Sequence, residues 1–334
     1  MKVPAIILAM FLACCCAPWN ASPQDNSCSK FLIPLTVRDA RGEVIHGFSA
    51  NDLEVTVDGG VRPADRLRRE DRPRRIVILL DASGSMKGTA EEIPWRQAVG
   101  SAQTITMLSE GRARLALVVF NSNIVEEIPF SADNAAITKR LIDLGRDREF
   151  FAHSVTGAAH LNDALARALQ LLGQATSADV LYIASHAQEH GSHQNLPALK
   201  QELLESGVRV FLTRVEMESQ NPWNKPNEQS GGQWSFESLV EQTGGQSMSL
   251  TNRTIALGFQ TRRVEGLMEA VRMYYEGLFD NEVLEIIAPQ PAPKKQDLKV
   301  ALSASGREHL AGAQLFFPRQ PYACPPPSSA TAAP

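Results

Sequence analysis

The sequence predicts an α/β protein with a doubly wound, mostly parallel sheet and a small β domain built from both ends of the chain. Residues 76–80 form an uninterrupted apolar run, which is typical of a strand buried on both faces of a parallel sheet. Beyond this run, strand-like segments alternate with helical patterns as far as residue 278. Further strand-like segments stand on both sides of this region, at residues 31–57 and 283–317.

Residues 28–72 are assigned to an N-terminal β segment. Residues 31–37 are rich in β-forming side chains, and residues 52–57 alternate with period two before two glycines end the run. Residues 62–75 are dense in arginine and carry two prolines, so we expect a solvated connector or a sheet edge there.

Residues 73–278 are assigned to the α/β domain. After the first strand, the pattern predicts strands at residues 114–120, 125–130, 180–184 and 208–212. It predicts helices at residues 94–108, 134–144, 161–172, 196–206 and 236–242, and a long final helix within residues 255–278.

Residues 279–322 are assigned to a C-terminal β segment that pairs with residues 28–72. Its strands are expected at residues 283–287, 298–302 and 313–317. Residues 323–334 consist mostly of Pro, Ser and Ala, and we expect a disordered tail.

Composition excludes several classes of partner. The chain has 334 residues, of which 43% are apolar and 21% charged, as in an ordinary soluble globular protein. The net charge of −4 offers neither a basic surface for nucleic acid nor a polybasic patch for a membrane. We therefore expect no nucleic-acid partner, and membrane association only through a lipid anchor.

Residues 1–21 are assigned to a signal peptide, because Lys2 precedes an apolar run that is too short to span a bilayer. The alternative is a buried N-terminal helix. Phe11-Leu12-Ala13-Cys14 resembles a bacterial lipobox, with Phe where Leu is usual, so lipidation and simple cleavage a few residues later both stay open. Both lipidation and simple cleavage imply export, to the periplasm, the cell envelope or the extracellular space.

Two cysteines, Cys28 and Cys324, remain after the signal peptide is removed. Because exported proteins meet an oxidising compartment, we expect these two to form a disulfide that joins the two chain ends. The alternative is a pair of free thiols, since a disulfide requires the two Cα atoms to lie close together.

The end of the first buried strand carries Asp81-Ala82-Ser83-Gly84-Ser85. This Asp-x-Ser-x-Ser motif, directly after such a strand, resembles the metal-ion-dependent adhesion site of von Willebrand factor type A (VWA) domains, which have a Rossmann-like fold. The resemblance covers about residues 74–275. Residues 31–57 also resemble the strand-rich preface of a bacterial subgroup best represented in Acidobacteria, and residues 274–318 occupy the place of its closing strands.

The motif suits a hard cation, because Mg²⁺ prefers about six oxygen ligands and Asp81, Ser83 and Ser85 can supply three. The resemblance implies two further ligands, a Thr and an Asp. Ala159 and His186 stand at those places, and Thr156 lies three residues before the first. We therefore expect weak or absent Mg²⁺ binding, with the motif residues capping a helix and bonding nearby amides.

A transition metal is an alternative occupant. His186, His190 and His193 follow a predicted strand, with His160 possible as a neighbour, and imidazole favours Zn²⁺ and related ions. Gly191-Ser192 indicates a loop, in which solvated histidines are the common outcome.

The sequence does not predict an enzyme. It contains none of the common nucleophile-elbow, dinucleotide, phosphate-loop or His-Glu-x-x-His motifs. A triad using Ser83 or Ser185 with His186 has nothing in the sequence to position it. An envelope hydrolase is therefore the third interpretation, behind a metal-dependent receptor that uses His186 with the Asp81 motif.

The leading interpretation is a protein-binding or scaffolding module whose partner the sequence does not name. Aromatic residues on polar loops are typical of binding surfaces, which singles out Phe150, Phe151, Trp223 and Trp234. The alternative is that these side chains anchor their loops onto the core.

Overall fold

The computed structural model describes residues 30–70, 73–88, 93–130, 133–215, 236–250, 255–257, 267–288 and 297–323. The assigned signal peptide, Cys28, Cys324, Trp223 and Trp234 lie outside the described residues, so the predictions made for them stay predictions. Among the described residues, no helix is both long enough and apolar enough to cross a membrane.

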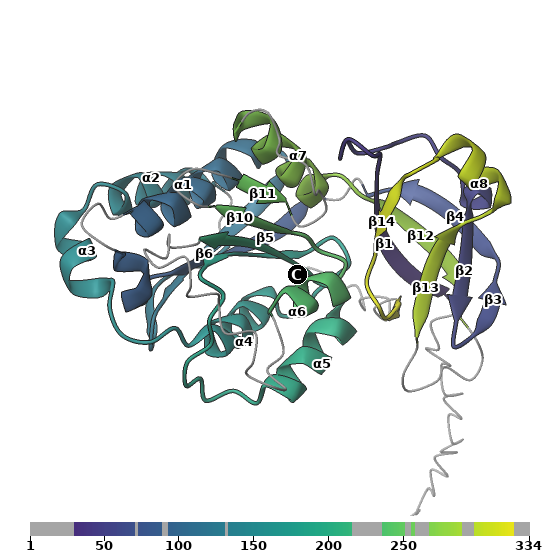
Figure 1. The fold of residues 1–334 in the computed structure, drawn as a ribbon. Coiled ribbons are helices and arrows are strands. Elements are labelled where there is room, and N and C mark those ends of the chain that lie inside the picture. The colour runs from purple at the N-terminus through teal and green to yellow at the C-terminus, as the bar shows by residue number, and fades with distance from the viewer. Residues whose placement is uncertain are drawn as a thin grey trace, which may run out of the picture.

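A seven-stranded sheet forms the centre of the α/β domain, with strand order β11-β10-β9-β8-β5-β6-β7 (Figure 1). The five inner strands run parallel, and the edge strands β7 and β11 are antiparallel to their neighbours. The doubly wound α/β architecture predicted from the sequence is therefore confirmed. The strands are β5 (Arg74–Asp81), β6 (Ala113–Phe120), β7 (Ile124–Ile128), β8 (Val180–Ser185), β9 (Arg209–Val215), β10 (Ser247–Leu250) and β11 (Ile255–Leu257).

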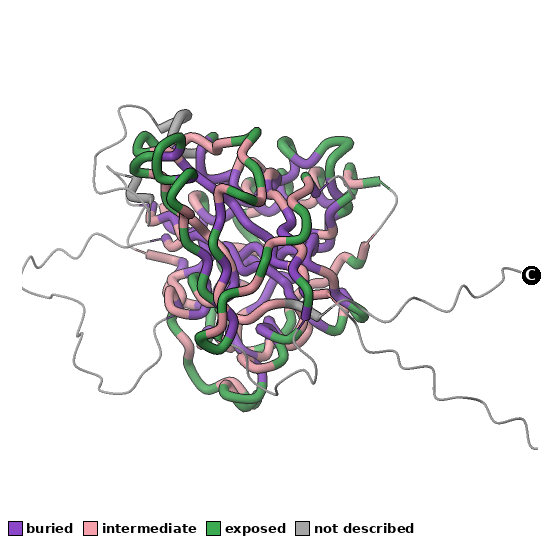
Figure 2. The backbone as a smooth tube through the Cα atoms, turned by 90° about the vertical axis from the view of Figure 1, so that its right-hand side faces the viewer, coloured by how far each residue is buried: buried purple, intermediate pink, exposed green. Residues whose placement is uncertain are grey.

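Helices cover both faces of this sheet because β5 is apolar on both sides. Ile76, Ile78 and Leu80 pack with one set of helices, while Val77 and Leu79 pack with the other. The first set is α1 (Ile93–Leu108), α2 (Ala135–Leu144) and α7 (Leu267–Phe279). The second set is α4 (Leu161–Leu172), α5 (Leu196–Ser206) and α6 (Phe236–Gln242). Buried backbone runs through the middle of the molecule, and exposed residues lie on its outer turns (Figure 2).

The two chain ends build a separate β domain, drawn to the right in Figure 1. One sheet has the order β14-β1-β12-β4 with β15 beside β1, and a second has the order β13-β2-β3. Apolar residues of both sheets form one core, which includes Ile33, Val55, Ile286 and Val300. The strands are β1 (Lys30–Arg38), β2 (Leu53–Val57), β3 (Gly60–Arg62), β4 (Ala64–Arg69), β12 (Glu282–Ile287), β13 (Leu298–Leu302), β14 (Gln314–Phe316) and β15 (Tyr322–Ala323).

The sequence-based element assignment was wrong at several places. The final helix, Leu267–Phe279, lies within the predicted range apart from its last residue, but the strand at Ile255–Leu257, which pairs with β10, was not predicted. Strand β10 was not predicted, because a strand of four residues is too short to show a periodic pattern. Its hydrogen-bonded pairing with β9 defines it instead. Ala323, assigned to a disordered tail, pairs with Phe31. The arginine-rich segment 62–75, by contrast, contains β4 at the edge of its sheet, paired with β12, which confirms the sheet edge given as one of its two alternatives.

Two short helices were also missed because side-chain caps define them more than periodicity does. Helix α3 (Arg148–Ser154) begins where the Asp147 side chain accepts a hydrogen bond from the Phe150 backbone. Helix α8 (Ala304–His309) begins where Ser303 accepts one from the Gly306 backbone. A 3-10 turn, η1 (Ala50–Asp52), precedes β2.

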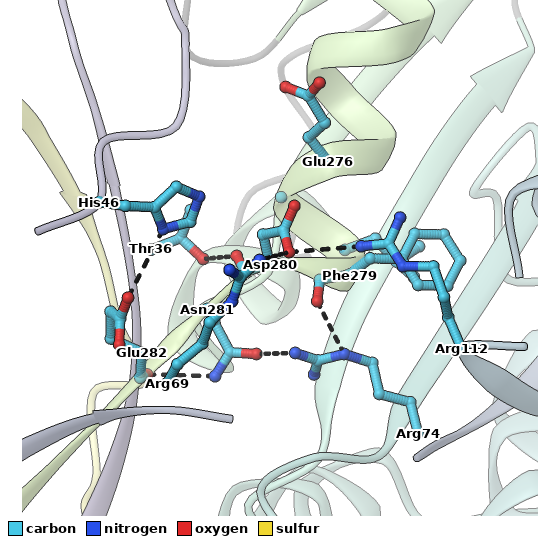
Figure 3. Close-up of polar contacts among 12 residues, drawn as sticks. Thr36, His46, Arg69, Arg74, Arg112, Glu276, Phe279, Asp280, Asn281 and Glu282 are labelled. Carbon is cyan, nitrogen blue, oxygen red and sulfur yellow. Dashed lines mark hydrogen bonds and ion pairs between the residues drawn. The ribbon is translucent and has the colours of Figure 1, made fainter. Parts of the chain in front are cut away.

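The end of α7 connects the α/β domain to the β domain through a polar junction (Figure 3). Arg74 donates to the Asn281 side chain and to the Phe279 carbonyl, 3.1 Å away. Asp280 accepts from Arg69 at 2.8 Å and from Arg112 at 3.3 Å. The carbonyls that end a helix lack partners within it, so Arg74 satisfies one of these carbonyls. Arg69 and Arg112 neutralise the Asp280 carboxylate.

A second contact of this junction is made by Arg38, the last residue of β1. Its fully buried guanidinium donates to the Met273 carbonyl at 2.6 Å and to Gln246 Oε1 at 2.9 Å. Burial lowers the pKa of Arg38 to about 10. The side chain therefore stays protonated at neutral pH and fixes the β domain against α7 and the segment before β10.

Candidate metal and ligand site at the carboxyl end of the sheet

The Asp81 turn follows the central strand β5 and is closed by hydrogen bonds from within the protein. Asp81 is fully buried, and its Oδ1 accepts from the Ser83 backbone N–H at 2.8 Å. Its Oδ2 accepts from Ser185 Oγ at 2.5 Å. Ser185 ends the neighbouring strand β8, and its Oγ also accepts from the Ala187 N–H at 2.9 Å. Both oxygens of the carboxylate thus have a protein donor.

The two motif serines bond to each other. Ser83 Oγ and Ser85 Oγ lie 2.9 Å apart, with Ser83 buried and Ser85 half-buried. Ser83 precedes the 3-10 turn η2 (Gly84–Lys87), yet its side chain makes no capping hydrogen bond there. The expectation that Ser83 caps a helix is therefore wrong, because its hydroxyl pairs with Ser85 instead. The expectation of bonds to nearby amides holds for Asp81.

A second loop, ahead of α4, lies directly against this turn. The Thr156 N–H donates to the Ala82 carbonyl at 2.8 Å, and the Gly84 N–H donates to the Gly157 carbonyl at 2.9 Å. Gly157 has φ of +77°, and a Cβ there would lie 2.7 Å from Ser122 Oγ, so the close approach requires glycine. The structure thus brings together the two segments that the sequence assigned to one site.

The two departures from the adhesion-site pattern occupy this region. Ala159 is 3% exposed and packs in the core on the α4 side, where it supplies a methyl group and no oxygen. His186 is half-buried directly after Ser185 and supplies an imidazole. Together with an Asp81 carboxylate that is already hydrogen-bonded on both oxygens, this donor set falls short of the octahedron of oxygens that Mg²⁺ prefers.

A cluster of two histidines and an aspartate lies beside the turn. The sequence indicated the two histidines as possible metal ligands but not the aspartate. His160, Asp163 and His193 each place a ligand atom within 4.8 Å of the others. In the described part of the chain, no such group of three includes His186 or His190. Asp163 was not singled out in the sequence analysis. Its position three residues after His160, on the first turn of a helix, is the signal that would have paired them.

Asp163 keeps its negative charge at neutral pH. Burial acts to raise its pKa, but hydrogen bonds from the His193 N–H, the His193 ring and the Gln194 N–H outweigh this and lower the pKa below its usual value. Its position in the first turn of α4 also places it near the positive end of the helix dipole.

Phe150 and Phe151 lie on α3 and pack partly against the core. The Phe150 ring stacks on the buried Trp95 ring, with centroids 5.8 Å apart. The Arg140 guanidinium lies 5.5 Å from the Phe150 centroid. Phe151 lines an open pocket together with Trp95 and several arginines, Arg96, Arg146 and Arg148. The anchoring role is thus visible for Phe150, and a recognition role for either side chain stays a prediction.

Comparison with known proteins identifies the class of the central domain. Residues 76–188 match the von Willebrand factor type A domain, so the chain contains a VWA domain. No curated protein sequence matches the chain.

Among solved structures, an aerotolerance-related membrane protein from Bacteroides fragilis NCTC 9343 is 14% identical and is matched over 62% of this chain and 98% of its own, with a TM-score of 0.37. The conserved hypothetical protein BatB from Bacteroides thetaiotaomicron is 12% identical over 44% of this chain and 68% of its own, with a TM-score of 0.32. The VWA domain of SpRpn10 is 11% identical over 60% of this chain and 93% of its own, with a TM-score of 0.36.

Proposed function

We propose that this chain is an exported protein-binding or scaffolding module whose VWA domain captures a partner protein at the carboxyl end of its sheet, without magnesium at Asp81. The single observation that carries this proposal is the hydrogen bonding of both Asp81 oxygens by Ser83 and Ser185. A carboxylate held in this way has no need of a cation to be stable in a buried position.

The fold supports this location of the binding face. Open α/β sheets hold their ligands beyond the carboxyl ends of the strands, and the loops that follow β5, β6 and β8 meet at this edge. Asn123 is exposed on the loop after β6, and Thr156 is exposed on the loop ahead of α4 that contacts the Asp81 turn, so a partner can reach the edge without displacing the core.

A non-catalytic role fits the bonding of the serines. The Ser185 hydroxyl donates to Asp81 and accepts from the Ala187 N–H, while the Ser83 hydroxyl pairs with Ser85. A nucleophilic serine needs its hydroxyl directed toward a base such as His186. The periplasm, envelope or extracellular location rests on the N-terminal segment, and the bacterial subgroup rests on the sequence resemblance.

Photo-cross-linking in the source cells tests the proposal. A photoreactive residue replaces exposed Asn123 at the carboxyl end of β6, and a matched control replaces exposed Glu110, just before the amino end of the same strand. We expect specific protein adducts from position 123 and not from position 110. Equal labelling at both positions, or none at position 123, would overturn the assignment of the face.

The role of magnesium is tested on the same adducts. Adduct yield is compared between metal-depleted protein and the same protein with Mg²⁺ restored. The proposal predicts equal yields. A yield that depends on Mg²⁺ would instead support a metal-dependent receptor in which His186 joins Asp81, Ser83 and Ser85.

The aromatic residues provide a further test of the face. Phe151→Ala removes a half-buried side chain from the pocket rim, while Phe150→Ala also removes the stacking on Trp95. If α3 takes part in recognition, Phe151→Ala lowers adduct yield while the unfolding midpoint stays close to that of the wild type. Unchanged yield for a folded Phe151→Ala variant would remove Phe151 from the binding face. The same comparison applies to Trp223→Ala and Trp234→Ala.

A further inference from the structure

We propose that His160, Asp163 and His193 form a zinc site with one open coordination position, beside the Asp81 turn. The cluster joins two loops at the carboxyl end of the sheet. His160 precedes α4, Asp163 lies in its first turn, and His193 lies on the loop between β8 and α5. The inference goes beyond the proposed function, because it concerns a metal that binds in the absence of any partner.

Two distances within the cluster, both to the Asp163 carboxylate, are close to those between neighbouring ligands of a tetrahedral zinc ion. His193 Nδ1 lies 3.1 Å and His160 Nδ1 lies 3.5 Å from Asp163 Oδ2. Two ligand atoms bound to the same Zn²⁺ at its usual bond lengths lie roughly 3.3 Å apart. The two imidazole rings stand edge to face, with centroids 5.6 Å apart and planes at 70°, so both can direct a nitrogen toward the carboxylate without clashing.

The His160 ring contributes a nitrogen that lacks a hydrogen bond. Its Nδ1 is buried and has no hydrogen-bond partner among the described residues, and the separation of 3.5 Å from Asp163 is an ion-pair distance. A buried polar atom without a partner is costly, and such atoms often mark a site for an ion. A metal ion between the two loops would satisfy this nitrogen.

Hydrogen bonds already hold the second loop in place against the first. Asp163 Oδ1 accepts from the backbone of His193 at 3.1 Å and from the backbone of Gln194 at 2.9 Å. Glu189 accepts from the Asn162 backbone at 2.9 Å and from the Ser192 backbone at 2.8 Å. Because the protein fixes the loop without metal, binding would order little beyond the side chain of His193, which is 83% exposed.

The ligand types select the metal. Two imidazoles and one carboxylate are a common set for Zn²⁺, whereas Mg²⁺ prefers oxygen alone. Three protein ligands leave one tetrahedral position for water or for an acidic group of a partner, as in zinc sites that are not purely structural. The side chain of His193 is exposed, on the same edge of the sheet as the proposed binding face, so water or a partner can reach the cluster.

Calorimetric titration with Zn²⁺ alone tests this site. The exported chain is purified without a histidine tag and with its thiols alkylated, so that Cys28 and Cys324 do not bind the metal. We expect the wild type to bind one Zn²⁺ with micromolar or tighter affinity. We expect His193→Ala and Asp163→Asn to weaken that affinity by about 10-fold or more, since even residues that only support a ligand usually matter by that factor.

His190→Ala is the matched control, because His190 is an exposed histidine of the same loop whose side chain lies outside the cluster and bonds Gln188 at 3.3 Å. It should bind Zn²⁺ like the wild type. Co²⁺ should give the intense visible absorption of a tetrahedral site in the wild type and in His190→Ala, but not in His193→Ala.

Two results would overturn the site. One is a wild type that fails to bind Zn²⁺, or a folded His193→Ala variant that binds it unchanged. The other is an equal loss in His190→Ala, which would assign the metal to a different set of histidines. Neither result affects the proposal of magnesium-free partner capture, which is measured on cross-linked adducts.

Discussion

Two carboxylates at the carboxyl end of the sheet, Asp81 and Asp163, differ in their burial and in the groups that neutralise or bond them. Asp81 is fully buried, and both of its oxygens accept hydrogen bonds from Ser83 and Ser185. Asp163 is partly exposed, with a side-chain exposure of 24%, and has imidazole nitrogens of His160 and His193 within 3.5 Å of one oxygen.

The difference lies in what completes each group. At the Asp81 turn, donors of the protein satisfy both carboxylate oxygens. The hydrogen bond from Ser185 to Asp81 also links the ends of the neighbouring strands β5 and β8. The Asp163 cluster has an imidazole nitrogen without a hydrogen bond, and its third member is exposed to solvent. The motif that resembles an adhesion site thus marks the closed site, while the proposed zinc site consists of residues outside that motif.

The strongest test of this contrast is the stability of variants at the two carboxylates. Asp81→Ala leaves the Ser83 N–H and the Ser185 hydroxyl without an acceptor in a buried site, so we expect a loss of about 2–4 kcal/mol in the free energy of unfolding. Asp163→Ala should lose about 1 kcal/mol, because water can replace a partly exposed acceptor. Urea denaturation followed by circular dichroism measures both.

Asp81→Asn serves as the control, because it keeps an acceptor for Ser83 and should lose less stability than Asp81→Ala. Equal losses at Asp81 and Asp163 would remove the distinction between a closed and an open site.

Restoring the missing ligands should turn the closed site into a magnesium site. The double variant Ala159→Thr with His186→Asp adds a hydroxyl and a carboxylate at the positions that the resemblance assigns to metal ligands. We expect saturable Mg²⁺ binding by calorimetry in the double variant, since the added charge and oxygens suit a hard cation. His186→Asp alone tests whether the carboxylate suffices. A folded double variant that binds Mg²⁺ no better than the wild type would show that more than these two positions separates this turn from a metal site.

Removal of one hydrogen bond should weaken the closed site by a smaller amount. Ser185→Ala removes the donor to Asp81 and the acceptor for the Ala187 N–H, so we expect a loss of about 1–2 kcal/mol. The urea midpoint reports the change. The account would be contradicted by a Ser185→Ala variant as stable as the wild type, because the bond that closes the turn would then contribute nothing.

The pH dependence of stability should reveal the smallest effect, at Asp163. Its pKa is lowered in the folded protein, so its stabilising contribution is complete above the usual carboxyl pKa and disappears as pH falls through the folded-state pKa. In metal-free protein, Asp163→Asn should therefore differ most from the wild type near neutral pH and least in acid. Urea midpoints measured across the acidic range test this. A difference that is independent of pH would mean that the charge of Asp163 is not responsible.

The α/β fold could be predicted because its signals are local and repeated. The apolar strand β5 and the helical patterns on both sides of it require burial on two faces, and only a sheet covered by helices provides that. Strand β10 and helix α3 were missed because pairing with β9 and the Asp147 cap define them, and neither leaves a periodic pattern.

The candidate site could be predicted only where it follows the chain. The sequence located the Asp81 turn and the segments around Ala159 and His186, since each comes next to a recognisable strand or helix. It could not show that Ser185 bonds Asp81, because that contact depends on the register of two neighbouring strands. The grouping of His193 with Asp163, rather than with His186 and His190, likewise depends on how the loop after β8 folds back onto α4.

Titration of the wild-type chain with Mg²⁺ tests the central claim, that the protein itself closes the Asp81 turn. Calorimetry is run on the wild type and on Asp81→Ala, which accounts for weak binding to other carboxylates. The account predicts that neither shows saturable binding and that the two titrations coincide. Micromolar Mg²⁺ affinity in the wild type that disappears in a folded Asp81→Ala variant would contradict it.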